Sequence, residues 1–396
     1  MGKKYNIIRT VHHVLRNVCD ELAYNLKRMF RDQALLTFAI IVPLLYPLIY
    51  SWIYTNEFVR DIPLAVVDMS HSHTSREFLR RLDATQEVKV AYNCDNMKEA
   101  RELSGKQKTR GIIYIPADFD IKINRGEQAQ VSVYCDMALM LTYKNILIAS
   151  QSIALDMGKD MMIHSSGAMT AHDEEVTATP VIIDEVQLFN PTGGYGNSLI
   201  PAVLIIIIQQ TLLLGIGLTS GSDRDKQRLE NIGIQDGRHV FYRFIGKAAA
   251  FIMLFLPLSM YICMAVPQFF SFTAIARHSD LMYLIFPYVM ACTMFAMTIS
   301  FFVSTRESVL LVVVFTSVPF LFLTGISWPE SNIPAFWKGI SYFIPSTFGV
   351  RAYLSLSSMG ASTNEILPEI RILCIQALVY SITAFLSMKY YLGNKR

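Results

Sequence analysis

Six long stretches without a charged residue constrain this chain more than any other feature. They cover residues 33–56, 186–222, 248–276, 281–305, 308–329 and 372–388. An uncharged apolar run of about 18 residues can cross a hydrocarbon core about 30 Å thick. The last stretch reaches this length if Arg371 and Lys389 extend their charged ends to the membrane interfaces. With only 17% charged residues in the whole chain, this pattern excludes a soluble dehydrogenase, kinase or nucleic-acid binder.

The fold class predicted is an α-helical polytopic membrane protein with six transmembrane helices. Runs such as Leu204–Ile208 and Val309–Phe315 are apolar on every side, whereas membrane β-strands alternate apolar and polar residues. In lipid, a helix satisfies all of its backbone groups internally. The first run starts late and holds Pro43, Pro47 and Trp52 where a signal peptide needs small residues. The expected spans are residues 35–54, 198–219, 245–266, 282–303, 308–326 and 370–390.

The charges between the spans predict the orientation. Residues 1–34 hold seven Lys and Arg against three acidic residues, and residues 223–247 hold six against four. Basic residues favour the cytoplasmic side. We therefore expect both termini in the cytoplasm and residues 55–195 outside. This segment has 14 basic and 20 acidic residues, which is consistent with export.

Residues 55–195 are predicted to form an external α/β domain, because the segment is too long for a simple loop. Strands are expected at 62–68, 88–92, 110–115, 129–135 and 180–188, and helices at 74–83, 96–104 and 139–165, with a helical turn at 116–124. Thr74 to Glu77 has the pattern of a capping box. His71 and His73 fit either a metal-binding pair or a solvated turn, and residues 172–175 either a polar site or a linker. Cys94 and Cys135 are the cysteines of this domain, and an oxidising exterior would permit a disulfide between them.

The sequence lacks the motifs of a catalytic site. It contains no Gly-x-Ser-x-Gly, His-Glu-x-x-His, Cys-x-x-Cys or phosphate-binding Gly-x-x-x-x-Gly-Lys-Ser/Thr pattern. We therefore expect no enzyme activity and no bound cofactor or metal. The spans also lack the ionisable relays of ion-coupled transporters. Among their polar residues, Gln209, Gln210 and Asn197 either line a translocation path or hold helices together.

One span, a large external domain and five further spans form an arrangement that resembles the permease subunits of ABC-2 type exporters, in the branch with an external insertion. Several motifs carry the resemblance in the expected order. They are Lys27–Asp32 before the first span, Ala65–Asp68 with Ser75-Arg76, Gly111–Phe119, Phe189–Pro191 with Pro201, and Gly325–Pro329 with Ile333-Pro334 and Ile344–Thr347. The family often has Arg-Glu-x-Glu-x-Gly-Thr after the second span. This chain keeps Glu230 and Gly233 of that pattern but has Gln227 and Ile234 at the first Glu and the Thr.

The resemblance implies a permease that exports a hydrophobic or amphipathic substrate. It further implies a separate ABC ATPase subunit, which binds ATP and Mg²⁺, and a second permease copy. The charged segment after the second span is the candidate docking region, with Arg228, Glu230 and Gly233 as coupling residues; a solvated loop is the alternative. Arg306 and Glu307, between the fourth and fifth spans, are further candidates. The expected location is the inner membrane, and a periplasmic adaptor is a further candidate partner.

Two more segments carry expectations. In residues 1–34, apolar positions such as Val11, Val18 and Leu22 recur at helical spacing among basic residues. This pattern predicts an amphipathic helix that lies on anionic lipid, with core packing as the competing reading. Residues 336–357 are apolar, aromatic and broken by proline, which predicts a re-entrant external hairpin. A membrane-anchored scaffold or sensor is the alternative function, and six spans exceed what anchoring needs.

Overall fold

The computed structural model describes residues 2–55, 59–166, 189, 195–230, 237–303 and 305–393. The chain divides into two compact units. The helical unit comprises Met1–Thr55 and Gln187–Arg396, and the inserted unit comprises Asn56–Val186. The limits that the sequence predicted for this insertion are residues 55 and 195.

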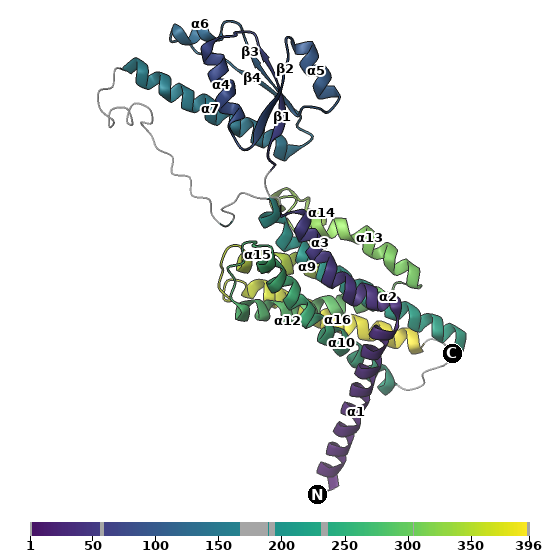
Figure 1. Cartoon of the computed structure of the whole chain (residues 1–396). Helices are drawn as coiled ribbons and strands as arrows, with labels where there is room; N and C mark the ends of the chain where they lie inside the picture. Colours follow the sequence, from purple (N-terminus) through teal and green to yellow (C-terminus); the bar gives the residue numbers. More distant parts are fainter. Residues whose placement is uncertain are drawn as a thin grey trace. The chain divides into compact units, whose positions relative to one another are not determined.

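The inserted unit contains a four-stranded mixed sheet in the order β2-β1-β3-β4. The strands are β1 (Ile62–Asp68), β2 (Val88–Asn93), β3 (Gly111–Ile115) and β4 (Ser132–Cys135). β2 and β3 run parallel to β1, with Leu64 opposite Gly111 in the β1–β3 pair, and β4 runs antiparallel to β3. The helices are α4 (His73–Asp83), α5 (Met97–Gly105), α6 (Phe119–Asn124) and α7 (Met140–Ser166) (Figure 1).

The two faces of the sheet bury different helices, because alternate residues of a strand point to opposite faces. Ile62, Leu64 and Val66 pack in one cluster with residues of α4, α6 and α7. Ala65 and Val67 pack on the other face, in a cluster with residues of α5. The unit thus has three layers. The β1–α4–β2 connection moves one way across the sheet, and the β2–α5–β3 connection moves the other way. Because such parallel crossovers are right-handed, α4 and α5 must lie on opposite faces.

One local prediction for the inserted unit needs correction, and two others lie outside the described residues. The cap of α4 is Ser72, whose hydroxyl accepts a hydrogen bond from the Ser75 amide at 3.0 Å, so the predicted capping box at Thr74 is wrong. The Thr74 hydroxyl instead donates to Asp120, and Glu77 pairs with Arg80 and Arg81. The expected strand at 180–188 and the polar segment at 172–175 lie outside the described residues.

The disulfide allowed for between Cys94 and Cys135 is not formed, and both are free thiols. Cys94 directly follows β2 and Cys135 ends β4, and these strands are the opposite edges of the sheet. Three strand spacings of about 4.8 Å separate them, whereas a disulfide needs Cα atoms within about 7 Å. Burial raises the pKa of Cys135 to about 11.

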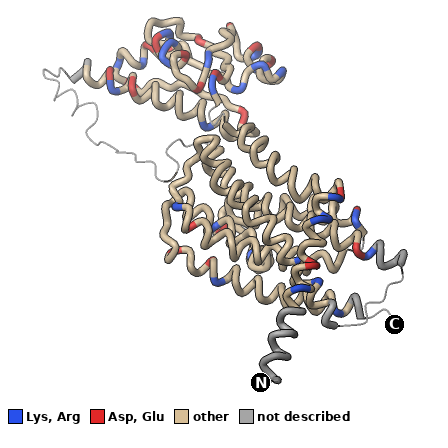
Figure 2. Tube along the Cα trace, turned by 60° about the horizontal axis from the view of Figure 1, so that its bottom comes forward, with Lys and Arg blue, Asp and Glu red and all other residues tan. Residues whose placement is uncertain are grey.

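Among the described residues, six helices are long and apolar enough to cross a membrane. The first combines α2 (Gln33–Leu36), a π-helical turn at Thr37–Ile41 and α3 (Val42–Ile53), and it follows α1 (Gly2–Arg31). The others are α9 (Tyr195–Glu230), α10 (Gly237–Met260) continued by a π-helical turn (Tyr261–Ala265) and α11 (Val266–Phe269), α12 (His278–Ser300), α13 (Arg306–Leu323) and α16 (Leu367–Gly393). Long parts of this unit are tan in Figure 2, because the spans lack charged residues through their middles.

α9 is the central helix of the helical unit. It packs against α3, α10, α12, α13 and a short helix, α15 (Pro345–Ser357), and residues such as Ile200, Leu204 and Ile208 have no exposed surface. Gly217 and Gly221 bring it close to α13: an added Cβ would lie 2.4 Å from Val309 Cγ1 and 3.0 Å from the Arg306 backbone, respectively. Small residues four apart permit this kind of close helix contact in membranes.

Two short helices occupy the segment predicted as a re-entrant hairpin. They are α14 (Ala335–Ser341) and α15 (Pro345–Ser357), and ten of the 13 residues of α15 are buried. The Tyr353 hydroxyl donates to the Cys263 carbonyl at 2.7 Å. That carbonyl lies four residues before Pro267, which has no N–H to bond it. α15 is therefore part of the bundle core.

The second half of α1 also packs against the core. Met29 has no exposed surface, Leu22 and Leu26 pack on the same cluster, and Gly246 of α10 lies so close that an added Cβ would be 2.5 Å from Glu21 Cβ. Core packing, the competing reading for residues 1–34, therefore holds for this half. The side chains before Val14 lie outside the described part of the chain.

Candidate functional site

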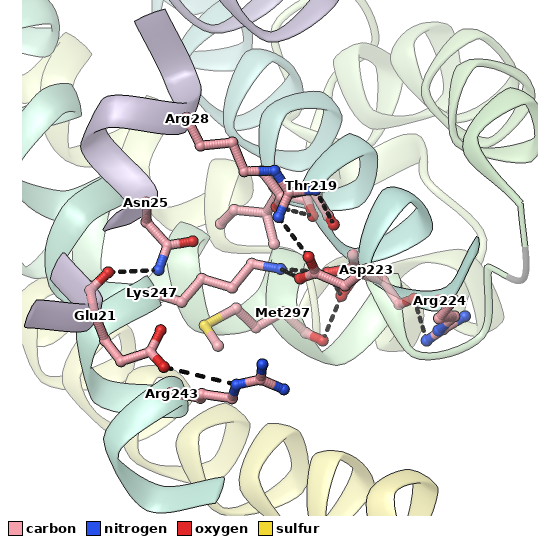
Figure 3. A network of polar contacts seen from close by, with 12 residues as sticks. Glu21, Asn25, Arg28, Thr219, Asp223, Arg224, Arg243, Lys247 and Met297 are labelled. Carbon is pink, nitrogen blue, oxygen red and sulfur yellow. Dashed lines mark hydrogen bonds and ion pairs between the residues drawn. The ribbon is translucent and has the colours of Figure 1, made fainter. Parts of the chain in front are cut away.

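Ion pairs at one end of the helical unit join five helices. At their centre, Asp223 of α9 pairs with Arg28 of α1 and, at 3.5 Å, with Lys247 of α10. Lys247 also donates to the Ser220 hydroxyl at 2.8 Å, and Arg28 donates to the Thr219 carbonyl at 3.3 Å. Figure 3 shows Arg28 and Lys247 reaching Asp223 from different helices. The side chains of both cations are about nine-tenths buried.

The neighbouring Arg224 connects α9 to the end of α12. Its guanidinium donates to the carbonyls of Ser300 at 2.8 Å, Phe301 at 2.9 Å and Val303. It also lies 5.7 Å from the centre of the Phe301 ring. The last carbonyls of a helix have no partner within the helix and need one from elsewhere. Arg224 supplies that partner, so the end of α12 is fixed to α9.

Asp32 and Arg306 connect the beginnings of the first and fifth spans. Asp32 caps α2 by accepting hydrogen bonds from the Ala34 and Leu35 amides at 3.1 and 3.4 Å. The Arg306 guanidinium, at the start of α13, donates to the same carboxylate at 2.5 Å. Burial acts to raise the pKa of Asp32, but the hydrogen bonds from Arg306 and the two amides outweigh it, and the pKa is below its ordinary value.

A further, more exposed pair joins α1 to α10. Glu21 lies 3.6 Å from Arg243, and its backbone carbonyl accepts a hydrogen bond from Asn25 at 2.8 Å. We call Arg28, Asp32, Asp223, Arg224, Lys247 and Arg306 the helix-end network. Its ion pairs and hydrogen bonds connect the first five spans and α1 at the end where α9 runs on into the charged residues 225–230.

The predicted coupling residues have different surroundings in the structure. Arg306 belongs to the helix-end network, and Glu307 is exposed in the first turn of α13. α9 continues as a helix through Arg228 to Glu230, where the sequence predicted a connection beginning at 223. The side chains of Arg228 and Glu230, and all of Gly233, lie outside the described part. Their coupling role stays a prediction.

The three polar residues considered for a path all lie in α9. Asn197 accepts a hydrogen bond from the Thr273 amide at 2.8 Å and so holds the connection after α11. Gln209 accepts from the Ser346 amide of α15 at 2.7 Å. Gln210 is 8% exposed, and neither end of its side-chain amide has a hydrogen-bond partner among the residues that the structure describes. Asn197 thus contacts a loop and Gln209 contacts helix α15.

Sequence reasoning did not identify five members of the network as site residues: Arg28, Asp32, Asp223, Arg224 and Lys247. Each lies within a few residues of an uncharged run, and this position is typical of residues at the ends of spans. The spacing of Gly217 and Gly221 in an apolar run was a second available signal, since it predicts a close helix contact. Neither signal identifies the partner.

Comparison with known proteins decides the family. A family model described as ABC-2 family transporter protein matches residues 34–386, which is 353 of the 396 residues. The chain belongs to the ABC-2 transporter family. No curated protein matches it. This ABC-2 protein is therefore a multi-pass membrane subunit of an ABC transporter, a class that transports with a partner ATPase.

Proposed function

We propose that this ABC-2 subunit exports a hydrophobic or amphipathic substrate from the cytoplasm across the inner membrane. Two copies would work with two separate ATPase subunits, which bind ATP and Mg²⁺. The helix-end network carries the proposal. Its charges gather at one end of a bundle whose spans have no charged residue in their middles. This arrangement supports coupling to an ATPase at that end rather than an ion relay within the spans.

The network supports a route from the ATPase to the spans. The end of α9, residues 225–230, is the proposed docking segment. Arg224, directly before it, holds the end of α12, and Asp223 holds α1 and α10. A displacement of this segment by ATP-driven closure would therefore move several helices together as rigid bodies.

The orientation belongs to the same proposal: the network end and both termini are cytoplasmic, and the inserted unit is external. Cys19 is exposed on α1, and Lys106 lies after α5 in the inserted unit. In intact cells, a membrane-impermeant maleimide should label Lys106→Cys but not Cys19. Labelling of Cys19 without permeabilisation would contradict this orientation.

Reconstitution with the ATPase tests the function. The isolated chain should hydrolyse no ATP, and the complete complex in proteoliposomes should show export and substrate-stimulated hydrolysis. Glu230→Lys should abolish both while membrane insertion is retained, because reversing a charge in a buried contact costs about 2–5 kcal/mol. Glu57→Lys, in the inserted unit, is the control and should change neither. Full export by well-expressed Glu230→Lys would refute the coupling role.

The alternative is a membrane-anchored scaffold or sensor whose inserted unit binds a partner. It predicts that the reconstituted complex transports nothing although the ATPase binds. The family match and the buried helix α15 favour transport, because anchoring does not require a short helix within the bundle core.

A further inference from the structure

Buried polar side chains from α9 and α15 meet near the midpoint of α9. Gln209 and Ser346 have no exposed surface, and Thr347 is 1% exposed. The Gln209 Oε1 atom accepts a hydrogen bond from the Ser346 amide at 2.7 Å and lies 3.8 Å from Cys292 Sγ of α12. Three helices therefore meet at the N-terminus of α15, a helix of 13 residues.

Several polar atoms of this group have no hydrogen-bond partner within the described part of the chain. They are Gln209 Nε2, Ser346 Oγ and Thr347 Oγ1, and both amide atoms of the adjacent Gln210. Buried polar groups in proteins are nearly always hydrogen-bonded, and each exception calls for an explanation. Polar residues that merely hold helices together bond to one another. Helix contact accounts for one bond of Gln209 and leaves the other atoms unexplained.

The chemistry of a ligand follows from what these atoms can do. Pro345 has no N–H, so the Ser346 amide is the first donor of α15, at the positive end of the helix dipole. A side-chain amide oxygen, that of Gln209, occupies it. Gln209 Nε2 and the two hydroxyls can donate hydrogen bonds as well. The site is thus suited to a hydrogen-bond acceptor of carbonyl type.

The site also lacks a positive side chain to offset an anion. Residues 186–222 and 281–305, which include the facing parts of α9 and α12, contain no charged residue. The charged residue of α15, Arg351, is 2.9 Å from Glu330 and is paired with it. An uncharged carbonyl therefore fits better than a phosphate or carboxylate.

We infer that Gln209, Ser346 and Thr347 bind an amide or ester carbonyl of the transported amphipathic substrate. This inference rests on the proposed export function and names the substrate class. In the present structure the site is closed, because Gln209 and Ser346 are fully buried. Separation of α15 from α9 would let the ligand carbonyl replace the Gln209 oxygen on the Ser346 amide, while Gln209 Nε2 donates to the ligand. The hydrogen bond of the Ser346 amide is then transferred to the ligand, and the one from Gln209 Nε2 is gained.

A pair of photoreactive probes tests this site in the full chain with its partner ATPase in nanodiscs. One probe is a diazirine-bearing fatty amide, and the other has the same length with methylene groups in place of the amide. In the wild type, the amide probe should label peptides from the middle of α9 and the start of α15 about five-fold more than its hydrocarbon analogue. Gln209→Met should remove the difference. Gln268→Met, at an exposed position of α11, is the control and should retain it.

Ser346→Ala provides a second variant if Gln209→Met does not fold. Its hydroxyl has no hydrogen-bond partner within the described ranges of the chain, so its removal should leave folding intact and reduce the amide selectivity. Equal labelling by both probes in the wild type, or undiminished selectivity in Ser346→Ala and Gln209→Met, would overturn the inference. Amide-selective labelling without export in proteoliposomes would reject the export function and retain the site. Export with unselective labelling would reject the site alone.

Discussion

Most ion pairs of the inserted unit join residues three or four positions apart, whereas those of the helical unit join different helices. Glu77 pairs with Arg80 and Arg81 along α4, and Asp118 pairs with Lys122. In the helical unit, by contrast, the hydrogen-bonded pairs Arg28–Asp223 and Asp32–Arg306 span 195 and 274 positions. Ion pairs therefore lie mainly within single helices in the inserted unit and connect separate helices in the helical unit.

Solvent exposure explains the difference. The Arg80 side chain is 77% exposed, and exposed pairs on a helix contribute little to stability. The sheet and its two buried faces hold the inserted unit together without them. In the helical unit the charges lie at span ends, where a cation separated from its partner would remain buried. These pairs therefore fix which helix ends move together.

The largest effect should come from Asp223→Ala. It leaves the mostly buried Arg28 and Lys247 without their shared carboxylate, and breaking a buried pair costs about 3–5 kcal/mol. Thermal unfolding of the purified protein in one detergent measures the loss. The double variant Asp223→Leu, Lys247→Met should recover part of the stability.

Asp118→Ala in the inserted unit is the matched control. It removes an exposed partner of Lys122 and should change stability far less than Asp223→Ala does. A similar effect of Asp118→Ala and Asp223→Ala would mean that the two kinds of ion pair do not differ.

Two glycines extend the comparison to packing. Gly217→Val places a side chain against Val309 of α13, where an added Cβ would lie 2.4 Å from Cγ1, and overpacking of this kind costs about 1–3 kcal/mol. Gly158→Ala in α7 meets nothing within 4 Å and should stabilise its helix by about 0.5–1 kcal/mol. Thermal unfolding measures the first variant and hydrogen exchange of α7 the second. Opposite signs are expected, and destabilisation by both would contradict the open surroundings of Gly158.

The sequence predicted more of the spans and strands than of the site. Strand 62–68 was predicted at its exact limits, because hydrophobic runs and turn residues are local signals. The pairing of Asp32 with Arg306 depends on how two distant helices are rotated about their axes, and no local pattern encodes that. Whether Cys94 and Cys135 form a disulfide could not be predicted for the same reason, since strand order decides whether two cysteines are neighbours. The polar group at Gln209 was recognised, but its partner Ser346 lies 137 residues away.

A smaller effect is expected at the cap of α4. Ser72→Ala removes the hydroxyl that bonds the Ser75 amide and should destabilise the helix by about 1 kcal/mol. Thr74→Ala removes a bond to Asp120 but no cap, so the first turn of α4 should stay protected. Hydrogen exchange of the α4 peptides in the full chain distinguishes the two variants. Loss of protection in Thr74→Ala but not in Ser72→Ala would support the capping box that the sequence predicted.

The smallest effect concerns the pH dependence of the exposed pairs. Hydrogen bonds from Arg80 and Arg81 lower the pKa of Glu77 from 4.5 to about 2. A carboxyl whose pKa is lowered by folding stabilises the folded state above its unfolded pKa, and this stabilisation is lost as the pH falls through the folded value. Hydrogen exchange of α4 should therefore be faster in Glu77→Gln than in the wild type at pH 6. The ratio of the two exchange rates, variant to wild type, should shrink as the pH falls from about 4.5 to about 2. Because the Arg80 side chain of this pair is exposed to solvent, added salt should reduce the ratio of the exchange rates at pH 6 as well. A ratio that is independent of both pH and salt would assign the effect of Glu77 to packing, and the ion pairs of the inserted unit would then have no measurable part in its stability.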